Sequence, residues 1–83
     1  MKTILIEIHL KEPITMLNLE SRYSLVAMIE SKQIGSVIDE TSSSNMMEVV
    51  LEVENNVGII DELHSMLAAL DIDNYLIKEI NQV

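Results

Sequence analysis

This chain of 83 residues contains no cysteine, phenylalanine or tryptophan, and only two glycines, two tyrosines and one proline. Without cysteine it has no disulfide, thiolate zinc site or cysteine nucleophile. With so few aromatic side chains it lacks the stacking platform that binds nucleic-acid bases. The scarcity of glycine and proline argues against a long linker or a disordered tail. These absences favour one compact domain with little chemistry of its own.

Length and charge narrow the class of protein further. We expect residues 1–83 to form a single domain, because 83 residues with 48% apolar side chains suffice for one core. The net charge of −9 disfavours nucleic acid and anionic membrane as partners. Glu7 and His9 interrupt the first apolar run before it reaches signal-peptide length, and no apolar run, residues 25–29 included, is long enough to span a membrane. We therefore expect a cytoplasmic protein.

In the first half of the chain, the spacing of apolar residues is first that of a strand and then that of a helix. Residues 2–11 alternate between apolar and mixed positions, which predicts a strand that Pro13 ends. Residues 19–33 repeat at helical spacing, with Asn18 as the expected N-cap. The expected buried stripe of this helix is Leu19, Tyr23, Val26 and Ile29.

The middle of the chain predicts a β-hairpin. Residues 36–41 form a strand of modest quality, and residues 46–54 alternate clearly. The polar residues 42–45 between them are the expected turn, and Asn55-Asn56 is the expected end of the second strand.

The last third predicts a second helix and a final strand. Acidic residues 61 and 62 occupy the first turn of the helix, where the helix dipole favours negative charge, and residues 75–80 have the composition of a strand. The order β-α-β-β-α-β predicts an α+β, ferredoxin-like fold: a four-stranded antiparallel sheet with both helices on one face and the first and third strands in the centre. The expected apolar stripe of this helix is Ile60, Leu63, Leu67 and Leu70.

The face of the sheet that the helices leave uncovered is the candidate binding surface. Aliphatic and acidic side chains alternate along it, which suits a protein partner, although acids on strands also serve solubility alone. Ser36, Leu76, Lys78 and Ile80 are expected to border it. The candidate partner-binding residues are Leu5, Glu7, His9, Ile38, Asp39, Glu40, Glu48, Val50 and Glu52.

Catalytic and metal-binding patterns are absent. Each histidine has a carboxylate at close spacing, His9 with Glu7 and His64 with Asp61, but no second histidine to complete a metal site. The segment 71–74 begins like a calcium loop but lacks its glycine and distal glutamate. We expect no cofactor, no metal and no enzymatic activity.

The run Ile34-Gly35-Ser36-Val37, the polar hairpin, residues 48–54 and the pair Ile60-x-x-Leu63 together resemble a group of small acidic ferredoxin-like proteins. This group includes bacterial immunity proteins of contact-dependent growth-inhibition systems. The resemblance extends from about Thr3 to Ile80. It implies that the chain binds a cognate toxin, basic and directed at nucleic acid, and covers its active or substrate-binding site.

Two other functions fit the same pattern of elements. Regulatory modules of the ACT type share the β-α-β-β-α-β order and bind amino acids near the turn after the first strand, which here reads Lys11-Glu12-Pro13-Ile14-Thr15. A structural homodimer, formed weakly through the open sheet, is the third alternative. The sequence leaves all three functions open.

Overall fold

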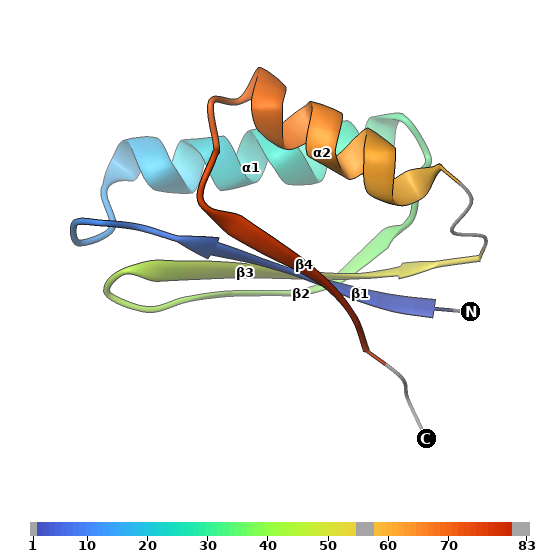
Figure 1. The fold of residues 1–83 in the computed structure, drawn as a ribbon, viewed down its shortest axis with the longest axis horizontal. Coiled ribbons are helices and arrows are strands. Elements are labelled where there is room, and N and C mark those ends of the chain that lie inside the picture. The colour runs from blue at the N-terminus through green and yellow to red at the C-terminus, as the bar shows by residue number, and fades with distance from the viewer. Residues whose placement is uncertain (1, 55–57, 81–83) are drawn as a thin grey trace.

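The computed structural model describes residues 2–54 and 58–80 and has the expected α+β, ferredoxin-like fold (Figure 1). The strands form one antiparallel sheet in the order β2-β3-β1-β4, and both helices cover the same face of it. The two central strands are therefore the first and the third, as the hydrophobic pattern predicts. The elements are β1 (Lys2–His9), α1 (Met16–Ser31), β2 (Ser36–Ser42), β3 (Met46–Val53), α2 (Ile59–Ala69) and β4 (Tyr75–Ile80).

The core lies between the sheet and the helices. Every second residue of β1 and β3 points into it, because successive side chains of a strand alternate between the two faces. The register pairs Ile4 with Leu51 and Ile6 with Val49, and all four are fully buried. The helices add Leu25, Ile29, Leu63, Met66 and Leu67 to this core.

Helix α1 begins three residues before the expected start because its N-cap is Thr15, not Asn18. The Thr15 hydroxyl accepts a hydrogen bond from the Asn18 backbone N–H, and the Asn18 side-chain oxygen accepts one from the Thr15 backbone N–H. This reciprocal capping box satisfies two backbone donors that the helix itself leaves unpaired.

The rotation of α1 about its axis also differs from the expectation. Tyr23, expected in the buried stripe, is 73% exposed, and Leu25 is fully buried in its place. Apolar residues surround this helix on all sides, since Met16 and Leu17 are exposed as well. The spacing alone therefore did not fix which side faces the sheet.

The structures of helix α2 and of the hairpin agree more closely with the expectation from the sequence. Gly58, with φ of 76°, precedes α2 in the left-handed region, and Asp61 and Glu62 lie in the first turn as expected. The predicted turn between β2 and β3 is confirmed by the hydrogen bond from Ser43 N–H to the Met46 carbonyl at 2.8 Å. The expected break at Asn55-Asn56 lies outside the described residues.

Candidate functional site

One face of the sheet carries no helix among the described residues, and we call it the open face (Figure 1). Its residues follow from the register of the strands and from the burial of their neighbours on the other side. They are Thr3, Leu5, Glu7 and His9 on β1; Met46, Glu48, Val50 and Glu52 on β3; Ser36, Asp39 and Thr41 on β2; and Leu76, Lys78 and Ile80 on β4. Most of the candidate partner-binding residues are therefore brought together on this face.

The centre of the open face is aliphatic. Leu5 of β1 lies opposite Val50 of β3, and both are half-buried although no layer covers them. Leu76 and Ile80 on β4 extend this apolar area, with 51% and 39% of their surface exposed. Exposed aliphatic surface of this kind is typical of protein contacts.

Glu7 and Glu48 lie directly opposite each other across β1 and β3. Like charges at such positions destabilise a sheet. Lys78 on β4 offsets this repulsion, because its Nζ lies 2.8 Å from Oε1 of Glu7. The hydrogen bond from Lys78 lowers the pKa of the Glu7 carboxyl below its ordinary value, and the charges of Lys78 and His9 act in the same direction against the opposing effect of burial. The negative charge of the Glu7 carboxylate is therefore balanced by the positive charge of Lys78.

The other three carboxylates of the open face lie over β2 and β3, and we call Asp39, Glu48 and Glu52 the acidic strip. None of the ion pairs within the described parts of the chain includes them. Asp39 Oδ1 accepts a hydrogen bond from the backbone N–H of Glu40, at 2.9 Å. The open face thus combines an aliphatic part, centred on Leu5 and Val50 and continued over β4, with a negative part formed by the acidic strip over β2 and β3.

A β-bulge in β2 determines which face of the sheet Asp39 and Glu40 occupy. The register shifts between Val37 and Asp39, so Ile38 is the extra residue, and it is 47% exposed. After the bulge Asp39 faces the open side, whereas Glu40 lies opposite the buried Val49 on the helix side. The expected position of Glu40 on the open face is therefore wrong.

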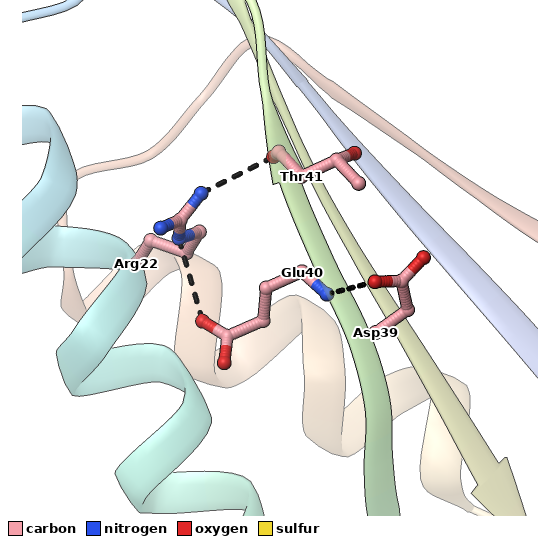
Figure 2. A network of polar contacts seen from close by, with 4 residues as sticks. All are labelled: Arg22, Asp39, Glu40 and Thr41. Carbon is pink, nitrogen blue, oxygen red and sulfur yellow. Dashed lines mark hydrogen bonds and ion pairs between the residues drawn. The ribbon is translucent and has the colours of Figure 1, made fainter.

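Figure 2 shows what Glu40 contacts instead. Its Oε1 lies 3.4 Å from Nε of Arg22, which reaches from α1 toward β2. The same guanidinium donates a hydrogen bond from Nη1 to the Thr41 carbonyl at 3.2 Å. Arg22 thus holds β2 to the first helix. The sequence pattern also missed Thr41, which follows Asp39 at the strand period and lies opposite Glu48 on the open face.

The two histidines occupy different surroundings. The Nε2 atom of His9 is shielded from solvent and has no hydrogen-bond partner within residues 2–54 and 58–80. Nδ1 of His64 lies 2.6 Å from the Tyr75 hydroxyl, so its contact is with this phenol and not with Asp61. Within the same ranges, no three potential ligands among His, Asp and Glu gather closely enough to hold a metal ion.

A small cavity of about 140 Å³ opens where β1 ends, α1 begins and the segment before β4 returns to the sheet. Its lining includes His9, Asn18, Asp71 and Asp73. It is separate from the centre of the open face and combines polar with apolar walls.

Comparison with known proteins supports the fold and leaves the function open. No protein-family model and no curated protein matches the chain. Among solved structures, the chain is similar to a provisionally assigned C-terminal regulatory domain of aspartate kinase from Porphyromonas gingivalis W83, with a TM-score of 0.58 and 15% sequence identity. The match covers 94% of this chain and 50% of that one, so the present chain spans about half the length of the neighbour. No described helix is long and apolar enough to cross a membrane.

Proposed function

We propose that this protein is a non-enzymatic binding module that docks a basic protein partner on the open face of its sheet. The observation that carries this proposal is the division of that face: the aliphatic centre of Leu5 and Val50 lies directly beside the acidic strip. A partner with cationic groups around an apolar contact matches both halves. Charge steers such partners together and fixes their orientation, while the buried aliphatic contact slows their release.

The particular partner that we propose is a bacterial toxin that acts on nucleic acid, neutralised in the cytoplasm by this chain as an immunity protein. Such a toxin has a basic surface for its substrate, and a chain with a net charge of −9 is attracted to the same surface. Occupation of that surface blocks access by nucleic acid. The resemblance of residues 34–37 and 48–54 to acidic immunity proteins supports this form of the proposal.

The experiment uses the purified product of the gene adjacent to the one that encodes this chain, titrated calorimetrically with two charge-matched variants. The double variant Glu48→Gln, Glu52→Gln removes two charges from the acidic strip, and Glu20→Gln, Glu30→Gln removes two exposed charges from α1. We expect the first to weaken binding at least about tenfold and to reduce its salt dependence, and the second to change it less than about twofold. Equal effects of the two variants, or a tight amino-acid ligand in place of the protein, would contradict the proposal.

A second candidate function, a regulatory module that binds an amino acid, is favoured by the structural neighbour and by the cavity of about 140 Å³ beside Asn18 and Asp71. A ligand that binds only the folded chain raises its melting temperature in proportion to the logarithm of its concentration. A thermal-shift screen with the twenty amino acids, each at millimolar concentration, tests this function directly. A shift that Asp71→Asn abolishes would favour it over toxin binding.

A further inference from the structure

The two edge strands of the sheet differ in how well they are protected against pairing with a strand of another molecule. β2 carries the bulge at Ile38 and the acids Asp39 and Glu40 beside it. Bulges and charges are the devices by which edge strands avoid unwanted pairing. β4 has neither a bulge nor a cluster of like charges, and its register with β1 is uninterrupted from Tyr75 to Ile80. We infer that a second copy of this chain pairs with β4, edge to edge and antiparallel, so that two sheets join into one.

The backbone of β4 presents hydrogen-bonding groups on its outer side. His9 N–H donates to the Asn74 carbonyl at 2.8 Å, in the same register as the β1–β4 ladder. Hydrogen-bonded pairs alternate along an antiparallel ladder, so Leu76 and Lys78 direct their backbone groups toward β1. Tyr75 and Ile77 therefore direct theirs away from the sheet. This outer row is a template for another strand.

The charges of β4 favour a second copy over a cationic partner. Both charged side chains of the strand meet an opposite charge on β1: Lys78 pairs with Glu7 at 2.8 Å, and Glu79 pairs with Lys2 at 3.7 Å. The edge is therefore electrically balanced in a chain whose net charge is −9. Two equally charged molecules repel each other least where they approach through such an edge. A basic partner is attracted instead to the acidic strip on the opposite half of the sheet.

A register centred on Ile77 satisfies both the backbone and the side chains. A two-fold axis at Ile77 places Ile77 opposite Ile77 of the second copy, with their outward backbone groups facing each other, and Leu76 opposite Lys78 of that copy. A two-fold axis at Lys78 would oppose two lysines, and like charges at opposite positions destabilise a sheet. The axis at Ile77 also keeps both open faces on the same side of the joined sheet. The dimer therefore presents one continuous surface, and its formation does not depend on the proposed binding of a toxin.

Sedimentation equilibrium of the purified full chain over a range of concentrations is the first test. We expect a reversible dimer of twice the 9.4 kDa chain mass. Its dissociation constant should fall when NaCl is raised from about 0.05 to about 0.5 M, because salt screens the repulsion between the two acidic chains. This sign is opposite to that expected for the basic partner on the open face. A monomer at millimolar concentration in both salts would overturn the inference.

A pair of substitutions at Leu76 tests the register. Leu76→Lys makes the chain less acidic but places the new charge opposite Lys78 of the second copy, and we expect the dissociation constant to rise about tenfold. Leu76→Glu makes the chain more acidic but faces the same lysine favourably, and we expect no weakening. Ile38→Lys is the matched control, because Ile38 is 47% exposed against 51% for Leu76 and lies on the other edge strand. Circular dichroism verifies that each variant folds. Equal dissociation constants for Leu76→Lys and Ile38→Lys, or weakening by Leu76→Glu, would overturn the inference.

Discussion

Lys78 on the edge strand β4 reaches across to β1, where its Nζ lies 2.8 Å from Oε1 of Glu7. This ion pair separates Glu7 from the other acids of the open face, because it neutralises the one carboxylate of β1, whereas no ion pair within the described residues includes the open-face acids over β2 and β3. The same contact balances the charge of the β4 edge. One lysine thereby contributes to both surfaces that we propose for binding.

The Glu7–Lys78 pair predicts a pH-dependent stability. The folded-state pKa of Glu7 is lowered from its ordinary value of 4.5, so the pair contributes stability that is fully present above this pH and is lost as pH falls through the folded-state value. We expect Lys78→Met to destabilise the chain near neutral pH and to have no such effect in acid. Urea unfolding of a double-mutant cycle with Glu7→Gln measures the coupling at each pH. A coupling that persists unchanged in acid would show that the two side chains interact other than through charge.

Leu25 and Tyr23 lie on the same helix, and we expect their truncation to alanine to change the stability of the chain by very different amounts. Leu25 is fully buried, and replacement by alanine leaves a cavity in the core, so we expect a loss of about 2–5 kcal/mol in the free energy of unfolding. Tyr23 is 73% exposed, and we expect Tyr23→Ala to change stability by less than about 0.5 kcal/mol. Urea midpoints with a constant m-value measure both. Equal losses would mean that α1 packs with a different rotation.

The capping box of α1 predicts a measurable role for Thr15. Its hydroxyl accepts the Asn18 N–H at 3.3 Å, and Thr15→Ala leaves this donor without its partner. We expect a loss of about 0.5–2 kcal/mol in the free energy of unfolding. Ser24→Ala, at an exposed position in the same helix, is the control and should be neutral or slightly stabilising. If the two variants behave alike, Thr15 is not the N-cap.

We expect that a methyl group added at Gly35, by substitution with alanine, disturbs the start of the β2–β3 pairing. A Cβ atom at this position would lie 2.6 Å from the Glu52 carbonyl oxygen and 2.8 Å from Cγ1 of Val53. We expect Gly35→Ala to cost about 1–3 kcal/mol of stability, because the backbone must move to relieve the overlap. Ser36→Ala, the adjacent exposed position, should be nearly neutral. Thermal unfolding of the two variants tests this prediction. Similar melting temperatures would contradict the close approach of β3 to position 35.

The positions of β1 and β3 could be read from the sequence because both strands are buried on one face only. Ile4 and Ile6 alternate with Leu5 and Glu7, and a shift by one residue would bury the charged side chain. The same alternation placed most of the candidate site, since residues that share a face of a strand share it in any sheet. The final strand, with bounds 75–80, was also predicted correctly.

The position of Glu40 could not be read in this way. β2 is an edge strand whose residues are mostly exposed, so its sequence has no strong apolar alternation to reveal the extra residue at Ile38. Glu40 therefore changed sides only when the strand paired with β3. The rotation of α1 was hidden for a related reason, because apolar residues surround this helix and several orientations bury a similar amount of apolar surface.

The amino-acid sequence by itself determined the order of the elements, the two central strands and the acidic net charge of the chain, because period and charge are local properties. Only the tertiary structure decided which side chains face one another: Lys78 with Glu7, Arg22 with Glu40, and Glu7 with Glu48. Such pairs depend on strand register, on a bulge and on helix rotation. These are set by packing between segments far apart in the chain, and no local pattern encodes them.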